Sequence, residues 1–517
     1  MENLAYGAVR IESAKFGKRG VCLTAVSFFV AFALCCFLGM AGPEVFVTKS
    51  GIAHLNVNRR GIETSVWNGN LINLHRENQL LWLTCTLTRP PSIETSLGFE
   101  YEQQITLDVL GTDEEISTRG GSANFPTIFK VYLGGKNVTR LVKFPAGAEK
   151  SNPITIFNMH SVQFENYKVK AEFYSPGHLL DEAGHASEVD HQLTAQFDLT
   201  YVNKEYTGFE MSWKYAFVVI TVLAMWSPRL NRGGLLSRSR IFTSCSLVFE
   251  GFFTKLCGTS TKIWSYQQKW VSVLLVLLFF FNDPLIYFEI YNTKVGGEVL
   301  GGIYIGFMAL FVTTLMLFWL CALDETRAQG SMSAANNRRK KGCKKHAGKI
   351  AFLFAFWLYL VITYSYIRMR ERGDVSYEAV QEGDRFVAAS VIGSLFILAY
   401  ALWFLFYTFR AVAVIRQLPP PFLFIFLITF FTFVATVVGI FIAAMYPLPG
   451  AAVDFLGMYS LYNLYIWTMA FVYAPLKSGG DNEDGSFGDF SMSVSSGENE
   501  GINDGGVGAD ELDDMQL

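Results

Sequence analysis

The residues best suited to chemistry lie inside an apolar stretch. Asn282-Asp283-Pro284 and Glu289 all fall within the apolar run from Trp270 to Ile290. An ionisable side chain is costly in lipid, so such residues are candidates for a functional site. Pro284 lacks a backbone donor and allows a kink. Two interpretations follow: these groups line a polar cavity for a ligand or an ion, or Asp283 caps a kinked helix end and is paired within a helical bundle.

A second polar set lies on the last apolar run, from Val453 to Ala474. Its candidate site residues are Tyr459 and Asn463, which are one helical turn apart and therefore share a face. Hydrogen bonds between neighbouring helices are the role that this pattern favours. A contribution to the same cavity as Asp283 is the alternative.

The sequence predicts no metal site, no cofactor and no catalytic activity. His178, His185 and His191 lie among acidic residues, but their spacing fits no known ligand pattern, so a solvated loop is favoured over a metal site or a pH sensor. The apolar runs contain no histidine, no paired-aspartate protease motif and no glycine-rich nucleotide loop. A net charge of −3 without a basic domain argues against nucleic-acid binding.

The composition indicates what must position these residues. Of the 517 residues, 51% are apolar and 17% are charged, against about 25% charged in a typical soluble domain. Lipid offers no hydrogen-bond partner to the backbone, so each spanning run is expected to be a helix of about 20 residues. Eight such runs are present: Val21–Ala41, Tyr215–Trp226 (which needs Trp213 or earlier residues to cross), Trp270–Ile290, Leu300–Leu323, Ile350–Tyr366, Val387–Phe409, Phe422–Met445 and Val453–Ala474.

The basic residues predict the orientation, because positively charged loops stay cytosolic. They concentrate before the first run and in the loops 227–269 and 324–349. The predicted organisation is a cytosolic N-terminus (1–20), a transmembrane signal anchor (21–42), a lumenal or extracellular domain (43–212), a seven-helix domain (213–475) and an acidic, disordered cytosolic tail (476–517). Cleavage of the first run as a signal peptide is the alternative to an anchor. The basic segment 338–345 is a candidate for binding anionic lipid, although a simple topology signal is the favoured explanation.

The segment 43–212 is predicted to be a β-sandwich. Short runs rich in β-branched and aromatic residues alternate there with glycine, proline and asparagine clusters. Cys85 is its single cysteine, so an internal disulfide is excluded and packing alone must stabilise the domain. Asn137-Val138-Thr139 is an N-glycosylation acceptor and predicts a glycan on Asn137.

Several local sequences, in this order of parts, are similar to a known family. They are Phe197-Asp198-Leu199-Thr200-Tyr201-Val202-Asn203, Asn282-Asp283-Pro284 and Tyr473-Ala474-Pro475. Together they resemble the Wntless-like membrane family, and within it the transmembrane protein 181 branch. The resemblance implies a GOLD-like sandwich on a receptor-like bundle of seven helices, and traffic through the Golgi, endosomes and the cell surface. Wntless itself carries lipidated Wnt proteins, but the sandwich here lacks the cysteines that Wntless uses for disulfides, which argues against Wnt as the cargo.

Three functions remain open from the sequence. The first is a trafficking or cargo receptor of the secretory pathway that binds a lumenal protein or a lipid-bearing ligand. The second is a cell-surface signalling receptor that acts through the loops 227–269 and 324–349. The third is an ion channel or transporter that uses Asp283 and Glu289. The resemblance favours the first.

Overall fold

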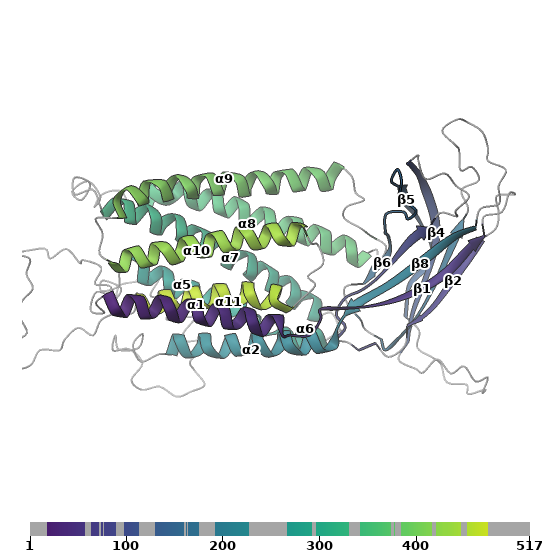
Figure 1. The fold of residues 1–517 in the computed structure, drawn as a ribbon, viewed down its shortest axis with the longest axis horizontal. Coiled ribbons are helices and arrows are strands. Elements are labelled where there is room, and N and C mark those ends of the chain that lie inside the picture. The colour runs from purple at the N-terminus through teal and green to yellow at the C-terminus, as the bar shows by residue number, and fades with distance from the viewer. Residues whose placement is uncertain are drawn as a thin grey trace, which may run out of the picture. The chain divides into compact units, whose positions relative to one another are not determined.

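The computed structural model describes most of the helical and β-rich parts of the chain, and the statements below concern those residues. They are 18–56, 64–71, 74–75, 77–88, 98–112, 130–159, 162, 164–174, 192–226, 266–291, 296–329, 342–373, 377, 384–415, 420–445 and 452–473. Within them an N-terminal helix is followed by a β-sandwich and then by a bundle of long helices (Figure 1). This confirms the predicted fold class.

The sandwich consists of two antiparallel four-stranded sheets. Their strand orders are β1-β8-β3-β6 and β2-β7-β4-β5. The strands are β1 (Phe46–Asn56), β2 (Thr64–Leu71), β3 (Leu81–Thr88), β4 (Phe99–Thr112), β5 (Lys130–Phe144), β6 (Ile154–Met159), β7 (Asn166–Tyr174) and β8 (Gln192–Val202). Strands β3, β4, β5, β7 and β8 overlap the short runs of β-branched and aromatic residues from which the sandwich was predicted. Strands β1, β2 and β6 were not predicted.

The sandwich is stabilised by the side chains that its strands turn inward. Along β3 buried and half-buried residues alternate, as expected for a strand with one face in the core. Trp67 stacks on Phe197 with ring centroids 4.5 Å apart, which joins the two sheets. Cys85 lies in the same core, where burial raises the pKa of its thiol well above the usual range. Its thiol is therefore a packing group rather than a nucleophile.

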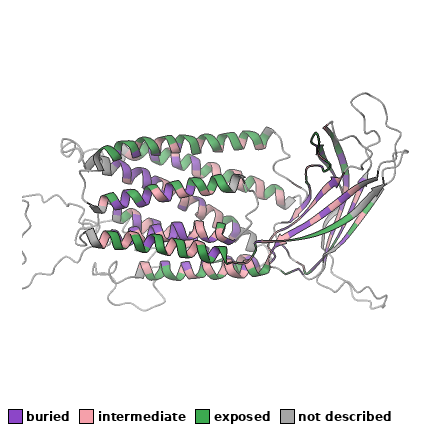
Figure 2. Ribbon diagram, in the orientation of Figure 1, coloured by how far each residue is buried: buried purple, intermediate pink, exposed green. Residues whose placement is uncertain are grey.

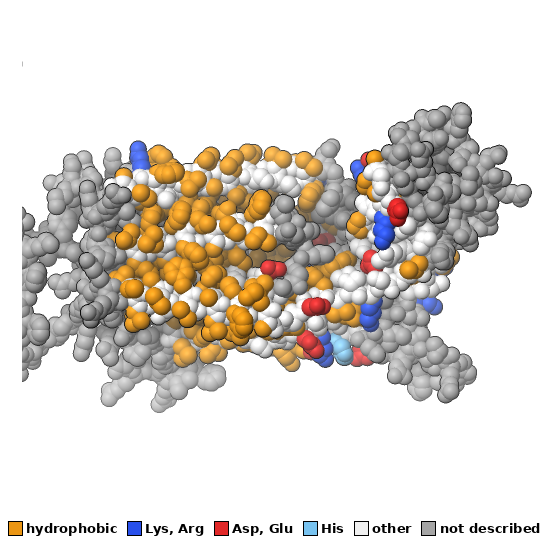
Figure 3. Space-filling model, in the orientation of Figure 1, with side chains coloured by type: hydrophobic (Ala, Val, Ile, Leu, Met, Phe, Trp, Pro, Cys, Tyr) orange, Lys and Arg blue, Asp and Glu red, His pale blue; other side chains and the backbone are white. Residues whose placement is uncertain are grey.

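The bundle contains α1 and the helices that follow the sandwich. They are α1 (Lys18–Met40), α2 (Lys204–Trp226), α5 (Tyr266–Phe281), α6 (Ile286–Tyr291), α7 (Gly296–Gln329), α8 (Gly342–Gly373), α9 (Asp384–Ile415), α10 (Pro420–Met445) and α11 (Ala452–Val472). In the described chain seven segments are long and apolar enough to cross a membrane; they lie on α1, α2, α5–α6, α7, α8, α9 and α10. Figure 3 shows the apolar surface of these helices, with charged side chains gathered towards the sandwich.

Helix α11 carries several polar side chains and packs against α1, α2, α5 and α10. It is 21 residues long, carries Asp454 and Asn463, and has eleven buried residues. Its tyrosines and amide face other helices rather than lipid, so its polarity reflects packing inside the bundle. Together with the seven segments above, it accounts for the eighth predicted run.

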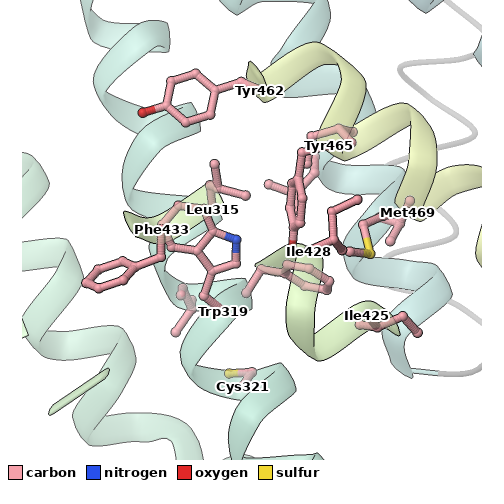
Figure 4. Close-up of a cluster of buried hydrophobic side chains, with 14 of the residues drawn as sticks. Leu315, Trp319, Cys321, Ile425, Ile428, Phe433, Tyr462, Tyr465 and Met469 are labelled. Atoms are coloured by element: carbon pink, nitrogen blue, oxygen red, sulfur yellow. The ribbon is translucent and has the colours of Figure 1, made fainter. Parts of the chain in front are cut away.

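The apolar core of the bundle forms where α7, α10 and α11 meet (Figure 4). Trp319 of α7 makes edge-to-face contacts with Phe433 of α10 and Tyr465 of α11, with ring centroids 6.0 and 6.1 Å apart. Helices α8 and α9 carry many more exposed residues than α7 and α11 do (Figure 2). These exposed side chains are largely apolar, as lipid contact requires.

A buried ion pair fixes α8 against α7. Lys349 donates to the Asp324 carboxylate at 3.0 Å and to the Leu320 carbonyl at 3.3 Å, and both charged side chains are buried. The Lys349 ammonium also lies 4.5 Å from the ring centroid of Tyr407 on α9. Three helices therefore meet around one charge.

Helix α1 packs closely against α11. Phe28 is buried and meets Phe431 of α10 edge to face. At Gly39 the two backbones approach so closely that a Cβ atom there would lie 2.6 Å from the Cα of Val453. Small residues allow such approaches between membrane helices.

We expect Gly39→Ala to destabilise the protein. The added methyl group has to push α1 away from the α11 backbone, and overpacking of this kind costs about 1–3 kcal/mol. Gly302→Ala is the matched control, because no atom lies within 4 Å of the position of its Cβ. Thermal unfolding of the purified chain in lipid nanodiscs compares the two, and equal midpoints for both variants would contradict the close approach at Gly39.

Candidate functional site

A break between α5 and α6 positions the predicted carboxylate. Helix α5 ends at Phe281, and Asp283 adopts a left-handed backbone conformation with φ 53°. Asparagine and aspartate tolerate this conformation better than most residues. The Asp283 amide still donates to the Phe280 carbonyl at 3.1 Å, and Pro284 follows without a backbone donor. The chain is therefore kinked here, as Pro284 suggested, and the Asp283 side chain is buried.

Asp283 is paired with a lysine from another helix. Lys214 of α2 lies with its Nζ atom 3.3 Å from Asp283 Oδ2 and 2.9 Å from Glu210 Oε1. The side chains of Lys214 and Asp283 are only 6% and 3% exposed, whereas that of Glu210 is 17% exposed. Of the two interpretations of Asp283, the structure therefore shows the paired carboxylate.

Two tyrosines complete the surroundings of the lysine. The Lys214 ammonium lies 5.1 Å from the ring centroid of Tyr304 on α7 and 5.8 Å from that of Tyr459 on α11. The two hydroxyl oxygens are 2.5 Å apart, so one tyrosine donates to the other. Both rings attract the cation through their π faces. We call Glu210, Lys214, Asp283, Tyr304 and Tyr459 the lysine cluster.

A buried amide network lies next to the lysine cluster. Asn282 and Asn463 exchange two hydrogen bonds of 2.8 Å. Thr221 Oγ1 of α2 accepts from Asn282 at 3.3 Å and from Trp467 at 3.2 Å. Asn463 also donates to the Tyr459 carbonyl at 2.9 Å. These bonds join α2, α5 and α11, and a fully satisfied network of this kind fixes one arrangement of the helices.

Glu289 lies at the margin of the cluster. It is half-buried on α6, and a Cβ atom at Gly301 of α7 would come within 2.5 Å of its Oε1 atom. Its carboxylate interacts electrostatically with Asp283, Lys214 and Arg368. Near the lysine, three carboxylates therefore face one ammonium group.

The structure brings four of the five predicted bundle residues into direct contact with one another or with Lys214. Asn282 and Asn463 contact each other, while Asp283 and Tyr459 contact Lys214. Lys214 and Glu210 were missed, although a glutamate four residues before a lysine at the start of the weakest apolar run was a signal for them. Asn137 belongs to the sandwich rather than to the bundle. It is exposed on β5, where its Oδ1 atom accepts from the Thr106 hydroxyl at 2.5 Å. The side chains of the basic segment 338–345 and of the three histidines lie outside the described residues, as does the tail from 474.

The sandwich is tied to the helix that carries Lys214. Strand β8 ends at Val202, and the Asn203 side chain caps α2 by accepting from the Glu205 amide at 3.0 Å and donating to the Glu44 carbonyl at 3.1 Å. Thr207 donates to the Glu77 carbonyl at 2.7 Å. Helix α2 therefore begins at Lys204, well before the predicted apolar run, because Asn203 forms its N-cap.

The Glu77 side chain makes a second connection between the sandwich and the bundle. Its carboxylate accepts from the Tyr291 hydroxyl of α6 at 2.5 Å and lies 3.1 Å from Lys204 Nζ of α2. The Tyr291 hydrogen bond is the main reason that the pKa of Glu77 is lowered, and Lys204 lowers it further. Glu77 is thus held in its charged form by both helices.

Together the fold and the cluster define a multi-pass helical membrane protein with a β-sandwich outside the bundle and a buried ionic cluster within it. The profile of the Wntless-like transmembrane domain matches residues 203–477, more than half of the chain. The chain therefore belongs to the Wntless-like transmembrane family. It is also similar to human (Homo sapiens) transmembrane protein 181, with 26% identity over 479 residues that cover 89% of this chain and 86% of that protein.

We expect Lys214→Met to be more destabilising than Asp283→Asn. The methionine variant leaves two carboxylates without their cation, and removing one partner of a buried pair costs about 3–5 kcal/mol. In Asp283→Asn, Lys214 still has Glu210, and asparagine accepts the left-handed backbone. The double variant should recover part of the loss of Lys214→Met. Denaturant unfolding in detergent gives the free energy of unfolding of the three variants. Strictly additive losses of this free energy would contradict a direct interaction.

We expect the contribution of Glu77 to stability to fade only in strong acid. Because the pKa of Glu77 is lowered in the folded state, its charge stabilises the fold above the unfolded value of about 4.3. The contribution is lost as the pH falls through the lowered folded pKa. The deficit of Glu77→Gln should thus be constant between about pH 7 and 5.5 and shrink below about pH 4. Thermal unfolding of both proteins across this range tests it, and a deficit that vanishes by pH 5.5 would contradict the assignment.

Proposed function

We propose that the protein is a trafficking or cargo receptor of the secretory pathway, in which the sandwich binds a lumenal protein or a lipid-bearing ligand. Membership of the Wntless-like transmembrane family supports a role in membrane traffic. The sandwich supplies two sheets with outward faces on the side that the basic loops assign to the lumen. We further propose that both termini are cytosolic and that the protein resides in the Golgi, in endosomes or at the plasma membrane.

The observation that carries this proposal is the connection from β8 to the lysine cluster through α2. Strand β8 runs directly into α2, and Lys214 lies ten residues after Lys204, about 15 Å along the helix. Glu77 and Asn203 hold the start of α2 to the sandwich. A partner that shifts β8 would therefore move Lys214 against Asp283. Such a mechanical link suits a receptor that reports binding outside the membrane to its helical bundle.

The same geometry makes an ion channel or transporter less favourable. An ion path through Asp283 would require the carboxylate to leave Lys214, because the pair is buried and closed by tyrosine rings. A signalling receptor would act through the loops 227–269 and 324–349, most of which lie outside the described residues. We therefore retain the cargo receptor as the function that the described contacts support best.

We expect Asn137 to carry a glycan if the sandwich is lumenal. Asn137 and Thr139 are both exposed on β5, so the acceptor is accessible on the surface of the sheet. Asn137→Gln and Thr139→Ala should each abolish an electrophoretic shift that a peptide N-glycosidase removes from the wild-type protein. A wild-type chain that never shows this shift, in cells that glycosylate a control protein, would contradict the proposed orientation.

The cargo function predicts a specific secretion defect. Cells that lack the protein should retain a defined subset of secreted or cell-surface proteins, which quantitative proteomics of medium and surface would identify. The wild-type chain should restore their export, and Glu77→Gln should restore it only in part while reaching the same compartment, because the junction is weakened and the bundle is intact. An unchanged secretome would contradict the proposal, and a membrane current abolished by Asp283→Asn would favour a channel instead.

A further inference from the structure

The lysine cluster has the form of a recognition site for an ammonium group that is filled by a side chain of the same protein. The Lys214 ammonium donates to two carboxylates, at 2.9 Å to Glu210 and at 3.3 Å to Asp283. Its remaining surface faces the rings of Tyr304 and Tyr459. Aromatic rings combined with carboxylates are the groups that proteins use to bind cationic amines. Lys214 and Glu210 belong to α2. The other three surrounding residues, Asp283, Tyr304 and Tyr459, lie on other parts of the bundle.

The surrounding groups are held in place largely without Lys214. Asp283 is fixed by the break between α5 and α6 and by its backbone hydrogen bond to Phe280. Tyr304 and Tyr459 hold each other through their hydroxyl groups. Phe281 and Phe455 pack against the Tyr459 ring at centroid distances of 4.8 and 4.5 Å. Truncation of Lys214 would therefore leave a prearranged site rather than a collapsed one.

The contacts select the chemistry of the amine. A primary ammonium has three N–H donors, which suffice for both carboxylates and leave the charge facing the rings. A quaternary ammonium has no N–H donor, so neither Glu210 nor Asp283 would receive a hydrogen bond from it, and Asp283 would keep only its backbone partner, Leu285. Burying them in that state costs free energy. The site therefore favours a primary ammonium over a quaternary one.

Charge and access also permit an external amine. The cluster holds two carboxylates and one lysine, so its formal charge is negative even when Lys214 is in place, while Glu289 and Arg368 lie at its margin and interact with each other. Glu210 is the most exposed of the paired groups and lies one turn nearer the sandwich than Lys214. An amine would thus enter from the sandwich end of the bundle, where headgroups of that leaflet and solutes both meet the helices.

We propose that Glu210, Asp283, Tyr304 and Tyr459 form a binding site for a primary ammonium group, which Lys214 fills in this conformation and which a primary ammonium on a phospholipid headgroup or on a free amine occupies when Lys214 withdraws. The occupant replaces the bridge between α2 and α5, so binding releases α2 from the bundle core. This site is independent of which cargo the sandwich binds.

The test uses the full-length Lys214→Ala variant in phosphatidylcholine nanodiscs, with ethylammonium as the probe. Ethylammonium should raise the thermal unfolding midpoint of the variant and saturate, with half of the effect at about 1 mM or above, given the small size of the probe. Tetramethylammonium at equal ionic strength should have no such effect. The wild-type midpoint should not change, because its site is filled. Lys214→Ala/Asp283→Asn should lose most of the response.

Two further arms decide the source of the amine and guard against a variant that does not fold. In nanodiscs containing phosphatidylethanolamine, a midpoint that is already raised and insensitive to ethylammonium would identify the headgroup as the occupant. A response to ethylammonium in both lipids would identify a free amine. Lys214→Ala/Glu289→Gln leaves one uncompensated carboxylate fewer without changing the four site residues, and it should show the same selectivity. If neither variant distinguishes ethylammonium from tetramethylammonium in either lipid, the proposal is overturned.

Discussion

The structure depends on the constraint that a charge inside an apolar bundle needs a partner within hydrogen-bond distance. Lys214 meets this requirement with two carboxylates and two tyrosine rings, and the elements around it are arranged accordingly. The helix between Phe281 and Ile286 breaks so that Asp283 can face α2. Helix α11 carries tyrosine and asparagine where lipid contact would demand apolar residues. Helix α11 can carry these polar groups because most of them are buried against other helices.

Much of this architecture could be predicted from the sequence, because lipid imposes strict demands on composition. Each long apolar run lies on a helix, although α2, α7, α8 and α9 extend several residues beyond their runs, and Asn282-Asp283-Pro284 marked the break. The alternating runs around Leu81–Thr88 and Gln192–Val202 gave strands. Asn463 was correctly favoured as a hydrogen-bonding residue between helices. In each case the local pattern and the final environment demand the same residue types.

The parts that escaped prediction depend on distant contacts. Lys214 pairs with a residue 69 positions away, and its own run is the weakest of the eight, so nothing local identified its partner. Strands β1 and β2 contain Ser50-Gly51 and Asn68-Gly69, which are typical of turns, yet pairing with β8 and β7 makes them strands. Tertiary hydrogen bonds outweigh local preference at these positions.

Helix α7 has a consequence for how the bundle can deform. Near one end its Tyr304 contacts Lys214 of α2, and near the other its Asp324 holds Lys349 of α8. Between them Trp319 is wedged against α10 and α11. A rearrangement of the bundle that kept all three contacts would therefore have to leave α7 in place. Motion that preserves these contacts would then involve the helices around α7.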